Sequence, residues 1–277
     1  MNLKKYIDKE NCVLLVCFLT FTFKLFNHTS FYSFLNNPIF YPSIDNTYWL
    51  FFITGLPKFI AKSAITSLFL DLLLCFTPLL LIFYKHRGLA FSYLLLIITY
   101  LLYFNSVTFH HYHDLISIVF LLLPLLVMQR EKKILIWDLI RYYFLFAMTS
   151  AGLWKLCRGS CFELNHMKLI LKEQHLTLVF ENTDSLFATI TSFINLHPMF
   201  GWILFSLATL IELSFIIGFF TKKYDLTLLI ILLIFCGLNF MIMGINSFTF
   251  CLFGITLIQK KRQSKQNTTE FNIDSLS

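Results

Sequence analysis

Residues 62–84 read KSAITSLFLDLLLCFTPLLLIFY, and this stretch decides the fold class. Asp71 is the one charged residue between Ser63 and Tyr84. A helix needs about 20 apolar residues to cross the hydrocarbon core of a bilayer, and this stretch is long enough. Its apolar residues do not alternate at a period of two, which excludes a strand of a transmembrane barrel.

Similar apolar runs recur on both sides of this stretch. The 277 residues are 57% hydrophobic and 13% charged, whereas soluble domains carry about 25% charged residues. This composition excludes a soluble globular enzyme, a disordered chain and a secreted disulfide scaffold. We predict an all-α integral membrane protein with about eight transmembrane helices. The other seven spans are 11–27, 88–106, 113–129, 134–155, 198–220, 225–243 and a shorter run at 245–259.

The distribution of basic residues predicts the orientation. With the N-terminus inside, 14 Lys and Arg residues fall in inside segments and 6 in outside segments. Cytoplasmic connections carry such an excess, so both termini are predicted to be cytoplasmic. A seven-span chain would move Lys260, Lys261 and Arg262 outside, which favours eight spans. The net charge of +7 is thus explained by the cytoplasmic connections of a protein in a lipid bilayer. No motif that recognises DNA or RNA bases indicates a nucleic-acid partner.

The remaining segments complete the domain organisation. Residues 1–262 are predicted to form one polytopic membrane domain, with 156–196 as an outside loop and 263–277 as a disordered polar tail. The aromatic stretch 48–52 is predicted to be an interfacial or re-entrant segment. Low charge with abundant Phe, Ile, Asn and Lys suits a bacterial inner membrane.

Lys155 is the sharpest candidate for a functional residue. It ends an apolar helix whose last turns carry the small residues 149–152, and small residues let helices approach closely. A lysine in a dry pocket can act as a base. The alternative is a lysine whose charged end reaches the aqueous interface.

Glu212 lies in the middle of an apolar run and needs a partner, since a carboxylate in a membrane is costly. Lys155 or a histidine near the outer face could supply it, and the alternative is a structural hydrogen bond between helices. Asp138 and Arg141 are three residues apart, so they can pair along one helix face. We assign these two to structure, although a proton-coupled transporter would also use residues of this kind, among them Asp71.

Two polar clusters leave alternatives open. Residues 110–114 read HHYHD, which allows proton handling by His113, metal binding or a solvated turn, although no second ligand group supports a metal. Cys157 and Cys161 flank a short polar turn. They could form a disulfide, remain free thiols or act as a redox pair.

Three motifs together resemble the HTTM family, the membrane part shared with vitamin K-dependent γ-glutamyl carboxylases. Residues 151–156 (AGLWKL) are similar to the family's A-G-x-x-K-L, and residues 113–116 (HDLI) to its histidine-bearing outside turn. Residues 243–250 (MGINSFTF) are similar to its G-x-F-x-[YW] ending. The order of the apolar runs fits over roughly residues 10–259.

The resemblance implies that Lys155 is the base that initiates hydroquinone oxidation by oxygen, with His113 as a second site residue. A quinone would then be the cofactor. Two positions depart from the family: Cys236 stands near a family histidine, and 157–162 replaces an acidic, tryptophan-containing run. The carboxylases also carry a large soluble domain that holds the peptide, and this sequence stops at Ser277, so glutamate carboxylation by this chain alone is not expected.

A smaller branch of the family, which includes membrane proteins required to mature a secreted peptide toxin, is more similar in size. DoxX-type quinone-linked proteins share the G-x-x-K-L helix and a later helix with a glutamate, as Glu212 is here. Three hypotheses follow. The first is an enzyme with a quinone or lipid pocket and Lys155 as base. The second is a non-catalytic partner that acts with an accessory protein in the maturation or export of a secreted peptide. The third is a small transporter or channel. The sequence leaves open whether the chain is an enzyme.

Overall fold

The structure is a computed structural model that describes residues 9–34, 40, 46–107, 115–181, 186–243 and 248–258. Within these ranges all regular structure is helical. The predictions for His113 and for the polar tail 263–277 lie outside the described residues.

Five helices are long and apolar enough to cross a membrane. They carry large apolar side chains on their outer surfaces, among them Ile65 (83% exposed) and Phe69 (58%), as lipid-facing helices do. The prediction of a helical membrane protein is therefore confirmed, while the count of eight spans and the orientation stay predictions. The five helices are α4 (Ala64–Phe83), α5 (Arg87–Val107), α7 (Arg130–Cys157), α10 (Pro198–Ser214) with α11 (Ile217–Phe220), and α12 (Asp225–Met243).

The three other predicted spans are shorter or interrupted. The run 11–27 forms α1 (Lys9–Phe26), which includes Lys9, Glu10 and Lys24. The run 113–129 forms α6 (Ile116–Leu122) and then the 3-10 helix η3 (Leu123–Leu126), because Pro124 has no N–H to continue an α-helix. In the run 245–259 the structure has two single turns, α13 (Phe248–Cys251) and α14 (Gly254–Leu257).

Two segments predicted to lie outside the transmembrane spans are helical. The aromatic stretch 48–52 lies in α2 (Asn46–Ile53), which is followed by α3 (Leu56–Lys62). The predicted loop 156–196 contains a 3-10 turn, η4 (Ser160–Phe162), and two helices, α8 (His166–Glu181) and α9 (Leu186–Leu196). In α9, Ala188, Thr191 and Ile194 recur at helical spacing and are buried, so tertiary packing explains this helix.

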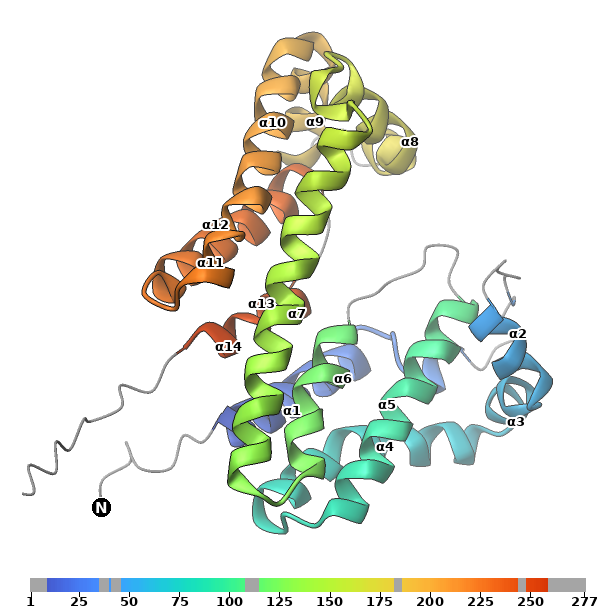
Figure 1. The fold of residues 1–277 in the computed structure, drawn as a ribbon. Coiled ribbons are helices and arrows are strands. Elements are labelled where there is room, and N and C mark those ends of the chain that lie inside the picture. The colour runs from blue at the N-terminus through green and yellow to red at the C-terminus, as the bar shows by residue number, and fades with distance from the viewer. Residues whose placement is uncertain are drawn as a thin grey trace, which may run out of the picture.

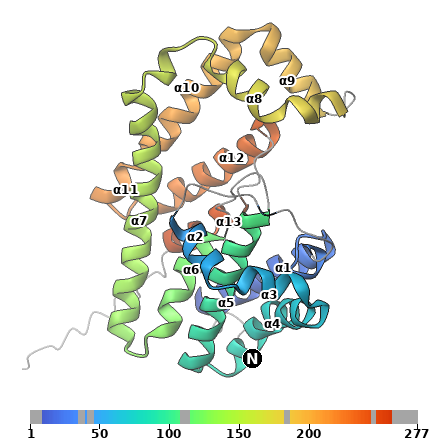
Figure 2. The ribbon, with the colours of Figure 1, turned by 90° about the vertical axis from the view of Figure 1, so that its right-hand side faces the viewer.

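Helix α7 runs from the level of α4 and α5 to that of α8 and α9 (Figure 1). Its 28 residues give a length of about 42 Å, more than the roughly 30 Å hydrocarbon core. In both views α8, α9 and α10 gather at its C-terminal end, while α4, α5 and α6 lie beside its N-terminal half (Figure 2).

The packing has one large core and one small core. The large core joins α1, α4, α5, α6, α7 and α12, and it includes the buried rings of Phe31, Tyr100 and Tyr103. Asp71 of α4 accepts hydrogen bonds at 2.9 Å from the backbone N–H groups of Phe31 and Tyr32, and thereby ties the chain after α1 to α4. The small core lies between α8, α9 and α10, and it is formed by Cys161, Met167, Leu171, Ile194 and Phe205.

Candidate functional site

Lys155 and Glu212 form an ion pair between α7 and α10. The Lys155 Nζ atom lies 2.6 Å from the Glu212 Oε1 atom. The side chain of Glu212 is 7% exposed and that of Lys155 is 27% exposed. Of the partners considered for Glu212 from the sequence, the structure has Lys155.

Gly152 explains why the two helices come close enough for this pair. A Cβ atom at Gly152 would lie 2.9 Å from the Leu213 Cγ atom and 3.1 Å from the Leu213 backbone nitrogen. Gly152 is one turn before Lys155, and Leu213 follows Glu212. The close approach predicted from the small residues therefore occurs, and it lies beside the ion pair.

A cavity of about 270 Å³ opens beside the ion pair, between α7, α8, α10 and α12. Its lining is apolar apart from Lys155, Glu212 and the amide of Asn239. The Lys155 ammonium lies 5.3 Å from the centre of the Phe205 ring, a cation–π distance. A pocket at Lys155 was among the hypotheses, but the sequence did not indicate which other residues line it, since that depends on how α8 and α12 pack against α10. The residues that line it are Lys155, Met167, Ile170, Leu204, Phe205, Leu207, Ala208, Ile211, Glu212, Phe235, Leu238, Asn239, Ile242 and Met243.

The second carboxylate oxygen of Glu212 is left without a donor. Its Oε2 atom is buried and has no hydrogen-bond partner among the described residues. A buried carboxylate oxygen without a donor is costly. Glu212 lines the cavity, so a turn of its carboxylate would let this oxygen accept a hydrogen bond from a ligand O–H or N–H. The site therefore suits a largely apolar molecule with one hydrogen-bond donor.

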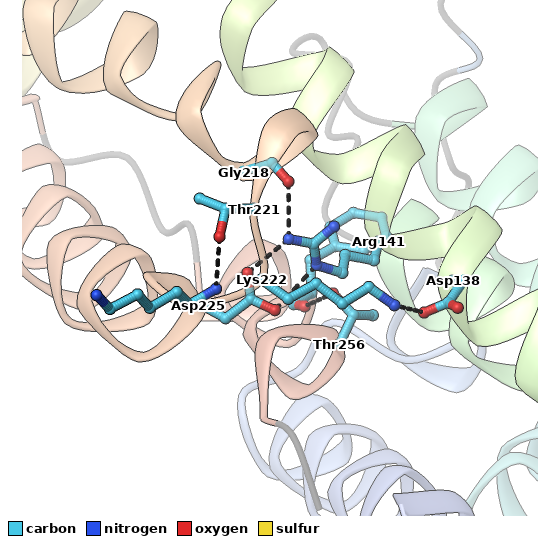
Figure 3. Close-up of polar contacts among 9 residues, drawn as sticks. Asp138, Arg141, Gly218, Thr221, Lys222, Asp225 and Thr256 are labelled. Carbon is cyan, nitrogen blue, oxygen red and sulfur yellow. Dashed lines mark hydrogen bonds and ion pairs between the residues drawn. The ribbon is translucent and has the colours of Figure 1, made fainter.

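A second ion-pair cluster lies nearer the other end of α7 (Figure 3). The Arg141 Nε and Nη2 atoms donate to the two carboxylate oxygens of Asp225 at 3.0 and 2.5 Å, and Nη2 also donates to the Gly218 carbonyl at 2.9 Å. Arg141 and Asp225 are both buried. Asp138 instead accepts from Lys222 at 2.7 Å, and that pair is exposed.

The predicted pairing of Asp138 with Arg141 is therefore wrong. Arg141 turns toward the start of α12, where Asp225 lies in the first turn and its charge suits the helix dipole. Asp225 was missed because it precedes an apolar run and reads as an ordinary helix start. Its only signal in the sequence was an acidic residue at the first position of the predicted span 225–243.

The other candidate residues do not take part in the Lys155–Glu212 pair or are not described. His113 falls outside the described residues, so its position relative to Lys155 stays a prediction. Asp71 accepts hydrogen bonds from backbone N–H groups and so has a structural role. Cys157 and Cys161 are free thiols, exposed and buried respectively. The described part of the chain contains no group of three His, Cys, Asp or Glu side chains arranged to hold a metal ion.

The arrangement can carry out one kind of chemistry, the movement of a proton next to an apolar ligand. Lys155 offers a nitrogen base or acid, Glu212 offers a proton acceptor, and the cavity lining keeps the surroundings poor in water.

No family model, no curated protein and no solved structure matches this chain.

Proposed function

We propose that this chain is a multi-pass protein of a bacterial inner membrane that acts in the modification or maturation of a secreted peptide, with Lys155 as the base. The observation that carries the proposal is the Lys155–Glu212 ion pair on the wall of an apolar cavity. The resemblance of residues 151–156 to the lysine helix of the HTTM family supports the same role.

A quinone fits the residues that line the cavity. Phe205 and Phe235 offer ring faces, the aliphatic residues suit an isoprenoid chain, and the Glu212 carboxylate can accept a hydrogen bond from a hydroxyl group of the reduced, hydroquinone form. These residues and Asn239 would hold the group. A bound quinone supplies two-electron redox chemistry, which no side chain of this site provides.

Lys155 and Glu212 can produce a base within the pair itself. Transfer of one proton from the Lys155 ammonium to the Glu212 carboxylate gives a neutral amine and a neutral carboxylic acid. Exclusion of water favours this neutral form, since separated charges are poorly stabilised in apolar surroundings. The amine of Lys155 can then take a proton from a ligand O–H group in the cavity.

Mass spectrometry of secreted peptides tests the proposal. Cells would carry the wild type, Lys155→Ala or Lys155→Arg at matched protein levels, with Lys132→Ala as the control. Lys132 is an exposed lysine on α7 that lies outside 156–196 and does not line the cavity. Loss of a peptide or of its modification in both Lys155 variants, with the control unchanged, supports a lysine base. An unchanged peptide profile in both variants overturns it.

The same assay, applied to further variants, separates the other two hypotheses. A non-catalytic maturation partner tolerates both Lys155 variants and is sensitive to changes in 156–196. A proton-coupled transporter depends on Glu212 or Asp71 and on the proton gradient. Asp71 is a weaker candidate for proton transport than Glu212, because both oxygens of Asp71 accept backbone hydrogen bonds.

A further inference from the structure

A second pocket, of about 220 Å³, lies at the opposite end of α7 from Lys155. It is formed where α1 and α7 begin, where α4 is followed by α5, and where η3 ends. Its polar lining consists of Glu10, Lys85, His86, Arg87 and Lys133, and aliphatic residues complete the wall. The proposed function does not use this pocket.

One buried carboxylate forms ion pairs with two of the cations of this pocket. The Glu10 side chain is 5% exposed, and its oxygens lie 2.7 Å from the Lys133 Nζ atom and 3.9 Å from the Lys85 Nζ atom. Glu10 thus joins two basic connections that are far apart in the sequence. The usual excess of Lys and Arg in cytoplasmic connections explains why these basic residues are present. It does not require that they line one pocket.

The charges in the pocket do not balance. Lys85, Arg87 and Lys133 provide three positive charges, and Glu10 provides one negative charge. The acidic and basic residues among the described lining therefore sum to a formal charge of +2. Helix α5 begins at Arg87, so the positive end of a helix of 21 residues lies at the same pocket. Guanidinium and ammonium groups at a helix N-terminus are the groups that bind phosphate.

We propose that this pocket binds an anionic phosphate group, and that the headgroup of an anionic phospholipid supplies it. The surroundings indicate a lipid. Phe83 and Tyr84 precede Lys85 and are 78% and 70% exposed, and Met128 on the pocket wall is 71% exposed. Exposed aromatic and apolar side chains at the ends of membrane helices lie where headgroups meet acyl chains. Basic pockets between membrane helices are known sites for such headgroups.

Native mass spectrometry of the full chain in detergent tests this inference. The probes are phosphatidylglycerol, phosphatidylcholine with the same acyl chains, and inorganic phosphate. The pocket variant is Lys85→Gln/Arg87→Gln. Its matched control is Lys222→Gln/Lys223→Gln, which removes the same charge from a connection that does not line the pocket.

We expect the wild type and the control to bind phosphatidylglycerol more tightly than phosphatidylcholine. Each basic residue near a membrane surface contributes about 5-fold to the binding of an anionic lipid, so the pocket variant should lose about 30-fold in affinity. Equal binding of the two lipids by the wild type, without binding of inorganic phosphate, would overturn the proposal. An equal loss in the pocket variant and the control would overturn it as well.

Two further arms keep the inference falsifiable if the pocket variant fails to fold. Glu10→Gln removes the competing carboxylate, so phosphatidylglycerol should bind about 5-fold more tightly. Weaker binding by a folded Glu10→Gln protein contradicts the proposal. Binding of inorganic phosphate by the wild type, with no preference between the lipids, would keep the phosphate site and overturn the lipid as its source.

Discussion

The buried pair of Arg141 and Asp225 allows a quantitative test of the structure. We consider Arg141→Met, Asp225→Leu and the double variant. Each single change leaves one charge without its partner at a position where both side chains are no more than 3% exposed. Two unit charges about 4 Å apart attract by about 4 kcal/mol at an effective dielectric constant of about 20. Each single variant should therefore lower the free energy of unfolding by about 3–5 kcal/mol.

The double variant should behave differently from the sum of the singles. It removes both charges and fills the space with apolar side chains, so its free energy of unfolding should lie close to that of the wild type. The assay is unfolding by SDS in mixed micelles, followed by tryptophan fluorescence. Trp137 lies on α7 one turn before Arg141 and reports on this region.

Asp138→Asn is the matched control because the sequence offered Asp138 as the partner of Arg141. The structure pairs it with Lys222 instead, and the two side chains are 41% and 45% exposed. An exposed pair contributes at most about 1 kcal/mol. A loss in Asp138→Asn as large as in Asp225→Leu would refute the pairing. So would a double variant that loses the sum of the two single losses.

Three further predictions concern the packing. Gly152→Ala should lower the free energy of unfolding by about 1–3 kcal/mol, because the new Cβ meets Leu213, including its backbone nitrogen. Gly237→Ala is its control, since a Cβ there meets no described atom within 4 Å, and it should raise that free energy by about 0.4–1 kcal/mol. Maleimide should label the exposed Cys157 faster than the buried Cys161, and equal rates would contradict the burial of Cys161. Asp71→Ala should lower the free energy of unfolding by about 1–3 kcal/mol for each backbone N–H that it leaves unpaired, and an unchanged value would contradict its role in holding the chain after α1.

The candidate site was partly predictable from the sequence. Lys155 and Glu212 both interrupt apolar runs, and a charge within a membrane segment needs a partner, so their pairing was among the hypotheses. The other residues that line the cavity beside them were not predictable, since α8 lies in a stretch that reads as a polar loop and Asn239 reads as an isolated polar residue. The pairing of Arg141 was mispredicted because spacing along one helix favoured the near residue Asp138.

The sequence by itself determined that this is a helical membrane protein. Length and hydropathy of a run are local properties, and a run such as 64–83 needs no knowledge of its neighbours to be assigned to a bilayer. Only the tertiary structure decided which charges meet and where cavities open. Lys155 and Glu212 are 57 positions apart and Arg141 and Asp225 are 84 apart. Such contacts depend on how each helix is rotated about its axis and how closely it approaches its neighbour. Side-chain packing across the whole bundle sets both of these quantities, and no single run of residues contains that information.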